Sequence, residues 1–227
     1  MRITFMIALA GCVAACGGAG GSNATAGGNS AAPAGIPASN GSDAAQQRQI
    51  PCSVQAHGMG AVTNGTAAQG PCDNSVDPQT VALDELIRIV PDQHPAFYYV
   101  LASRLYAANR KDEAVFWMYA GQLRYRIRLA CHPDLAPDTE PALFGSLQET
   151  VGRPVNEYGF GDLTALPATL ERVLAWDAAT HNGFEPKAAC ASAIAQQRQG
   201  LGQLIAHVRT NGDDIRRQRA ANGLPNR

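Results

Sequence analysis

Side chains that could carry out chemistry gather in one short segment, residues 152–162 (GRPVNEYGFGD). Arg153, Asn156, Glu157, Tyr158 and Asp162 stand there beside three glycines, in a stretch without helical or strand periodicity. Its two carboxylates could serve as the acid and base of an envelope-acting hydrolase, although a spacing of five residues in a loop supports that only weakly. A structural interpretation is favoured, in which the two Asx side chains cap helices and the tyrosine packs into the core. As a loop held by helices, the segment is also our candidate for contacting a protein partner.

The usual catalytic and metal-binding motifs are missing. The chain has no G-x-S-x-G, no H-E-x-x-H and no EF-hand loop, which are the patterns that would indicate a nucleophile elbow, a zinc protease or a calcium site. Its five histidines are scattered, and we expect them to be solvated or to cap helices. The sequence therefore predicts no catalytic residue, no metal and no cofactor.

The N-terminus has the layout of an export signal. Residues 1–15 begin with one basic residue, Arg2, continue through an apolar run over residues 3–9 and end in small residues. This end resembles the signal of bacterial lipoproteins twice, in LAGC ending at Cys12 and in VAAC ending at Cys16. The second gives the more usual signal length, so we favour lipidation of Cys16, with Cys12 as the alternative. The resemblance implies a lipid anchor at the outer membrane, facing the periplasm; an ordinary cleaved signal with a soluble product is the other interpretation.

The remaining cysteines suggest disulfides. Cys52, Cys72, Cys131 and Cys190 make an even number in an exported chain, which is typical of two bridges. Three pairings are open, and we choose Cys52–Cys72, which would close a glycine-rich loop, and Cys131–Cys190, which would tie the end of one helix to the start of a later one. A zinc site is the alternative use, but neither C-x-x-C nor H-x-H accompanies these residues.

Composition divides the chain into a signal over residues 1–15, a tether over 16–50, a disulfide-closed loop over 51–76 and a helical domain over 77–222. The tether is almost entirely Gly, Ala, Ser, Asn and Pro, and such a segment buries too little apolar surface to fold. The whole chain has a formal net charge of −1. Nothing in this charge predicts binding to nucleic acid.

The folded part should be all-α, a bundle of about six helices around a buried central one. The stretch from Ala114 to Ala120 (AVFWMYA) is apolar on every side, which is typical of a helix that neighbours surround. Caps, prolines and apolar spacing predict helices over residues 77–90, 95–108, 111–131, 140–151, 165–179 and 186–209, and a marginal polar helix over 213–221.

Two of these helices also resemble a single tetratricopeptide-type hairpin. No second copy follows one repeat length later, so the pattern predicts one antiparallel helix pair rather than a repeat array. The residues at consensus offsets are Tyr98, Leu101, Ala102, Leu105, Asn109, Ala114, Met118 and Gly121.

Together these features favour a lipid-anchored, periplasmic module that binds a protein partner in the cell envelope. Its plan of lipobox, low-complexity tether and small disulfide-stabilised domain is similar to that of bacterial immunity lipoproteins, which neutralise toxic effectors. An envelope assembly or secretion accessory lipoprotein would share the same plan, and the hydrolase that uses the carboxylates of residues 152–162 is the third class.

Overall fold

A computed structural model describes residues 76–185, 188 and 190–227, all of which belong to the unit Arg48–Arg227. The predicted signal, tether, lipidation cysteines and Cys52–Cys72 bridge lie outside the described residues. Within the described part of the chain every regular element is a helix, so the all-α prediction is confirmed. None of these helices is long and apolar enough to cross a membrane.

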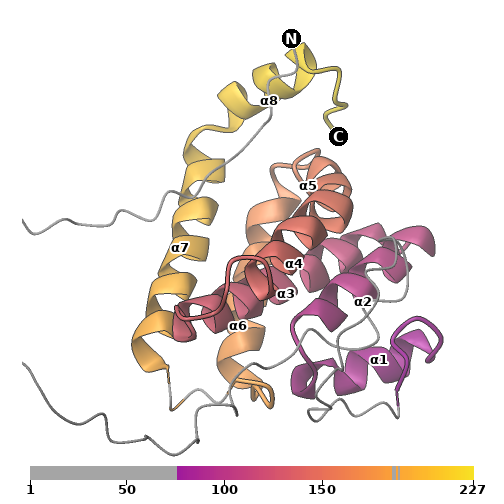
Figure 1. Ribbon diagram of the computed structural model, residues 1–227. Coiled ribbons are helices and arrows are strands. Elements are labelled where there is room, and N and C mark those ends of the chain that lie inside the picture. The colour runs from indigo at the N-terminus through magenta and orange to yellow at the C-terminus, as the bar shows by residue number, and fades with distance from the viewer. Residues whose placement is uncertain (1–75, 186–187, 189) are drawn as a thin grey trace, which may run out of the picture. The chain divides into compact units, whose positions relative to one another are not determined.

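Figure 1 shows the arrangement of the helices. In chain order they are α1 (Leu83–Ile89), the 3₁₀ turn η2 (Val90–Asp92), α2 (Ala96–Ala107), α3 (Lys111–Cys131), α4 (Glu140–Leu147), the π-helical turn η3 (Gln148–Gly152), α5 (Arg153–Gly159), α6 (Ala165–Ala179), α7 (Ala191–Thr210) and α8 (Gly212–Ala221).

Helix α3 is the central element, as its composition predicts. It contacts α2, α4, α5, α6 and α7. Most of its side chains from Ala114 to Arg128 are buried, and of the AVFWMYA stretch only Phe116 is partly exposed. A helix enclosed in this way takes most of its stability from packing, because its apolar surface is removed from water on nearly all sides.

Helices α2 and α3 form a hairpin with a close approach between them. Asn109 ends α2 in the left-handed conformation, with φ 60°, and the N–H of Arg110 donates to the carbonyl of Leu105 at 2.9 Å, which is the Schellman pattern of helix termination. A Cβ on Gly121 would lie only 2.4 Å from the Cβ of Tyr98. The helix pair therefore needs glycine there, while its resemblance to a tetratricopeptide unit stays a prediction.

The segment over residues 152–162 differs from the prediction of a loop. It forms α5 and a short connection to α6. Pro154 falls in the first helical turn, where the missing N–H costs nothing, and the π-helical turn before it carries the chain onward from α4 without a break. Val155 and Gly159 are buried, and a Cβ on the glycine would already touch Val115 of α3 at 3.3 Å. Packing against the central helix thus turns an apparent loop into a helix.

Two predicted helices begin later than expected. Asp77 accepts a hydrogen bond from the N–H of Gln79 at 2.9 Å, so residues 77–81 form a turn and α1 begins at Leu83. The helix expected from residue 186 begins at Ala191, directly after Cys190. Cys190 bonds to Cys131 with a Cα–Cα distance of 5.8 Å, which confirms the second predicted disulfide.

Candidate functional site

Buried charges line the second half of α3. Arg124 is 1% exposed, and its Nε lies 3.3 Å from Oδ1 of Asp177 on α6. Its other nitrogens donate to the backbone carbonyls of Pro91 and Thr180, each at 3.3 Å. The guanidinium also lies over the ring of Trp176, 4.5 Å from its centroid. One arginine thus ties the central helix to η2 and to the end of α6.

One turn further on, Arg128 joins two carboxylates. It donates from Nε and Nη2 to both oxygens of Glu140, at 2.5 and 2.6 Å, and from Nη1 to Glu185 at 3.2 Å. Burial would raise the pKa of Glu140, but its contacts with His94 and Arg128 outweigh burial and hold the pKa below its usual value. The glutamate is therefore ionised in the interior, where a two-point contact with arginine is the favourable geometry. Both buried arginines of α3 are thus paired with carboxylates from other parts of the chain.

His94 completes this buried network. Its Nδ1 accepts the backbone N–H of Ala96 at 3.1 Å, so it caps the start of α2, and its Nε2 lies 3.4 Å from Oε2 of Glu140. This second contact is an electrostatic approach rather than a well-formed hydrogen bond, because Nε2 has no hydrogen-bond partner by geometry. Burial lowers the pKa of His94. The histidine is accordingly neutral at pH 7 and forms part of the framework.

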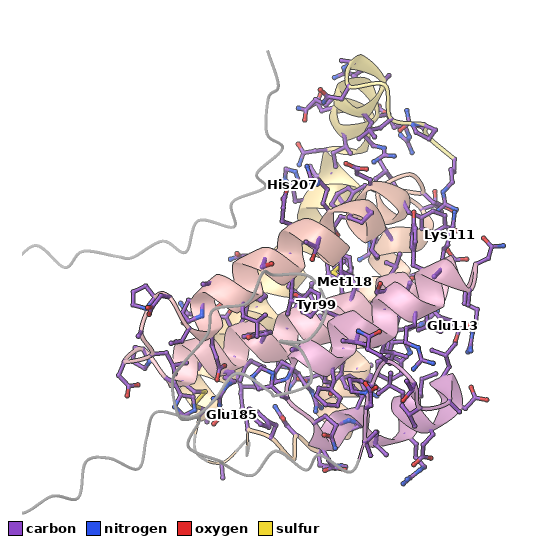
Figure 2. The ribbon with its side chains drawn as sticks, turned by 45° about the vertical axis from the view of Figure 1, so that its right-hand side comes forward. Tyr99, Lys111, Glu113, Met118, Glu185 and His207 are labelled. Atoms are coloured by element: carbon purple, nitrogen blue, oxygen red, sulfur yellow. A yellow bond between two sulfur atoms is a disulfide. The ribbon has the colours of Figure 1, made fainter. Side chains whose placement is uncertain are left out.

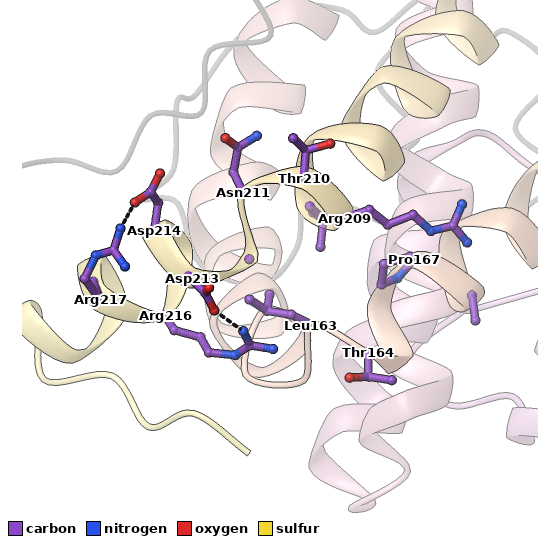
Figure 3. Close-up of a pocket in the computed structure, with 13 residues that line it drawn as sticks. Leu163, Thr164, Pro167, Arg209, Thr210, Asn211, Asp213, Asp214, Arg216 and Arg217 are labelled. Atoms are coloured by element: carbon purple, nitrogen blue, oxygen red, sulfur yellow. Dashed lines mark hydrogen bonds and ion pairs between the residues drawn. The ribbon is translucent and has the colours of Figure 1, made fainter.

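The surface offers a different feature, a cleft of about 570 Å³ between the start of α6 and the corner where α7 meets α8. Leu163, Pro167 and Val208 form its apolar part. The corner contributes the ion pairs Asp213–Arg216 and Asp214–Arg217, which stand opposite Thr164 and Pro167 in Figure 3. The cleft is lined by Leu163, Thr164, Pro167, Ala168, Val208, Arg209, Thr210, Asn211, Gly212, Asp213, Asp214, Arg216 and Arg217.

Apolar and charged side chains line the cleft together, a combination that protein interfaces also contain. Arg209 pairs with Glu171 at 2.8 Å, and both side chains are about half exposed. Exposed pairs of this kind contribute little to stability, so their charges are available to orient a partner.

The five residues proposed from sequence occupy α5 and the turn after it, next to the cleft in the chain. Asp162 uses Oδ1 to accept the backbone N–H groups of Thr164 and Ala165, at 3.0 and 2.9 Å. It therefore caps α6, as the structural interpretation expects. Glu157 is exposed on α5. Of these two carboxylates, Asp162 caps a helix and Glu157 does not.

The other three candidates differ in their surroundings. Arg153 forms an exposed pair with Glu149 one turn earlier. The Oδ1 of Asn156 is buried without a hydrogen-bond partner, so this oxygen does not cap a helix as expected. Tyr158 is partly buried and packs against the core, while its hydroxyl donates to Asp112 at 3.1 Å and the guanidinium of Arg227 lies 3.6 Å from its ring centroid. The structure thus places these residues on one short helix but gives them separate partners.

The sequence did not predict the cleft, although it predicted the helix boundaries that lie beside it. The helices predicted over residues 186–209 and 213–221 leave Asn211 and Gly212 between them, and these two residues lie at the corner between α7 and α8. Leu163 comes directly after the capping aspartate. The amphipathic pattern of α8 could have indicated that these parts lie close together. Its apolar Ile215 has to be buried, so the helix must fold back from the α7–α8 corner onto the bundle.

The chain has no match among known protein families, curated proteins or solved structures.

Proposed function

We propose that this chain is a lipid-anchored protein-binding module of the bacterial cell envelope, held to the outer membrane through Cys16, or through Cys12. The observation that supports export is the Cys131–Cys190 disulfide. Disulfides form and persist in oxidising compartments such as the periplasm, which is where the signal-like N-terminus would deliver the chain.

The binding part of the proposal is supported by the division of charge in the domain. Arg124 and Arg128 of α3 and their carboxylate partners are buried in the interior, where they hold α3, α4 and α6 together. The exposed charges of the α7–α8 corner instead line a cleft together with the apolar side chains of Leu163, Pro167 and Val208. A domain that is held together by its interior and leaves a mixed apolar and charged surface at one corner is suited to binding a partner.

Metabolic labelling with a palmitate analogue tests the anchor. The wild-type chain should be labelled and should fractionate with membranes. Cys16→Ser should remove the label while Cys12→Ser keeps it, because only the cysteine at the cleavage site becomes the lipidated first residue. Retention of the label by Cys16→Ser and its loss in Cys12→Ser would move the anchor to the alternative cysteine, and an unlabelled wild-type chain would refute the anchor.

A matched pair of substitutions on α6 tests the binding surface. Ala168 and Ala175 are both exposed on this helix, but only Ala168 lines the cleft. With the disulfide kept intact, in-cell crosslinking followed by affinity purification should recover one stoichiometric partner with the wild-type chain and with Ala175→Arg. Ala168→Arg places a long cation in the cleft and should lose that partner. Equal recovery by both variants, or no stoichiometric partner for the wild type, would contradict the proposal.

The sharper form of the proposal is immunity, in which the bound partner is a toxic effector that acts in the envelope. Cells that produce such an effector in the periplasm should survive when the wild-type chain or Ala175→Arg is present, and should die when Ala168→Arg replaces it. Survival with both variants would show that protection does not depend on the cleft. Death in the presence of a wild-type chain that is correctly anchored and still binds its partner would exclude immunity and leave the accessory role in envelope assembly.

A further inference from the structure

Three side chains with metal-binding atoms meet where α3 ends and α7 begins, and a fourth, His132, contacts one of them. The Sγ atoms of Cys131 and Cys190 and a carboxylate oxygen of Glu185 all lie within 4.8 Å of one another. Nε2 of His132 lies 2.8 Å from Oε2 of the same glutamate. Figure 2 shows Glu185 beside the disulfide, at the end of the bundle opposite Lys111.

The backbone and a neighbouring network hold these groups in place. Cys131 is the last residue of α3, His132 follows it, and Cys190 directly precedes α7. Glu185 is buried, its own N–H donates to Oδ1 of Asn182 at 3.1 Å, and its carboxylate accepts from Arg128 at 3.2 Å. Outer contacts of this kind are what orient the ligands of a metal site.

We propose that the reduced form of this cluster binds one Zn²⁺ ion through Cys131, Cys190, Glu185 and His132. The disulfide and the metal complex are then alternative states of one site. Two thiolates, one imidazole and one carboxylate form a ligand set that zinc accepts in tetrahedral geometry. Its Zn–S distances of about 2.3 Å place the two sulfurs about 3.8 Å apart, a separation that fits inside the present cluster without moving either helix far.

The metal ion would also offset most of the negative charge at the site. Two thiolates, Glu185 and Glu140 carry four negative charges, while the metal ion and the buried guanidinium of Arg128, which contacts both glutamates, carry three positive charges. Free thiols are mostly protonated at neutral pH. Zinc therefore binds with release of two thiol protons to solvent, and its affinity falls as the pH is lowered.

Switching between the two states requires a two-electron reductant, which we assign to a dithiol. One of its thiolates attacks a sulfur of the Cys131–Cys190 bond, and its second thiol resolves the mixed disulfide. The dithiol becomes a disulfide, and both cysteines leave the exchange as thiols. A newly exported chain reaches the same dithiol state before its cysteines are first oxidised, so zinc binding and oxidation compete for the two sulfurs.

The experiment uses the full chain with Ser at Cys12, Cys16, Cys52 and Cys72, so that no other thiol can bind metal. The reduced protein is checked for helical content and titrated with Co²⁺, whose visible bands report tetrahedral thiolate coordination, and then with Zn²⁺ in competition. One equivalent should bind to the reduced form and none to the oxidised form. Adding Ser at Cys131 and Cys190 should abolish binding.

Two further variants test the other ligands. Glu185→Gln should weaken Zn²⁺ binding at least tenfold, and His132→Ala, at a side chain that is 41% exposed and so tolerates truncation, should do the same. A folded, reduced chain that binds no metal overturns the proposal. Unchanged affinity in either variant overturns it too, because metal held by the cysteines alone, in a folded or an unfolded chain, would not depend on these two side chains.

Discussion

Replacing Gly121 by alanine tests the closest approach in the bundle. The added Cβ would lie 2.4 Å from the Cβ of Tyr98, whereas carbon atoms pack at about 3.5–4.0 Å. The clashing atom is the first carbon of the tyrosine side chain, whose position the backbone fixes, so no rotamer change relieves the clash. Tyr98 is fully buried, and its ring forms a cluster with those of Trp117 and Trp176. Helices α2 and α3 must therefore separate by roughly 1 Å, and the packing around them is lost with that movement.

The size of the effect follows from two opposing contributions. Forcing a methyl group into a well-packed core costs about 1–3 kcal/mol, and the rigid contact places Gly121→Ala at the upper end. Alanine recovers about 0.5–1 kcal/mol over glycine through helix propensity. The free energy of unfolding should thus fall by about 2 kcal/mol, which lowers the melting temperature by roughly 4–8 °C for a domain of this size.

Gly202→Ala is the matched control, because Gly202 also lies inside a helix but a Cβ there would meet nothing within 4 Å. It should raise the free energy of unfolding by about 0.5–1 kcal/mol. Urea unfolding followed by circular dichroism and by tryptophan fluorescence gives both values. If Gly121→Ala proved as stable as Gly202→Ala, the close packing of α2 on α3 described above would be wrong.

Three further outcomes follow from the network and the caps. Serine at both Cys131 and Cys190 should lower the free energy of unfolding by about 4 kcal/mol in urea titrations, because the bridge closes a loop spanning a sequence separation of 59; an equal loss on adding reductant to the wild type would confirm the cause. Glu140→Gln leaves Arg128 buried without its main anion and should cost about 3–5 kcal/mol at neutral pH. The folded-state pKa of this glutamate lies below its unfolded value, so its contribution to the free energy of unfolding is present above about pH 4.3 and is lost in acid. The difference in unfolding free energy between wild type and Glu140→Gln should therefore narrow in acid, and a difference that stays constant with pH would contradict this assignment. Asp162→Ala removes the cap of α6 and should cost about 1 kcal/mol, measured by thermal melting, whereas a loss of partner binding at unchanged stability would give this residue a contact role instead.

Local signals in the sequence were sufficient for several elements. The helix over residues 165–179 has the bounds predicted from its apolar stripe, and α3 ends at the cysteine before His132 and Pro133, as expected. The helix predicted over residues 95–108 stops directly before Asn109, whose left-handed conformation terminates α2. In each case the information lies within a few residues of the feature it determines.

The predictions from sequence fail where contacts between residues far apart in the chain determine the local structure. Gly159 and Pro154 look like helix breakers, but contact with Val115 of α3 makes this segment helical, and residue spacing carries no trace of that contact. The buried pair of Arg124 and Asp177 joins residues 53 positions apart. The cleft likewise combines the start of α6 with the α7–α8 corner. Tertiary adjacency of this kind is set by packing rather than by local preference.

The strongest ties of the bundle are concentrated at one end of α3. The disulfide and both buried arginines lie in its last two turns, whereas α8 contacts chiefly α7 and buries only Ile215 and Arg219. Local opening should therefore begin at the α7–α8 corner and spread toward the cross-linked end. Backbone amides of α8 should exchange with deuterium at the lowest protection, and those of α3 only on global unfolding. The surface proposed to grip a partner would then be the part of the domain that adjusts most readily on contact.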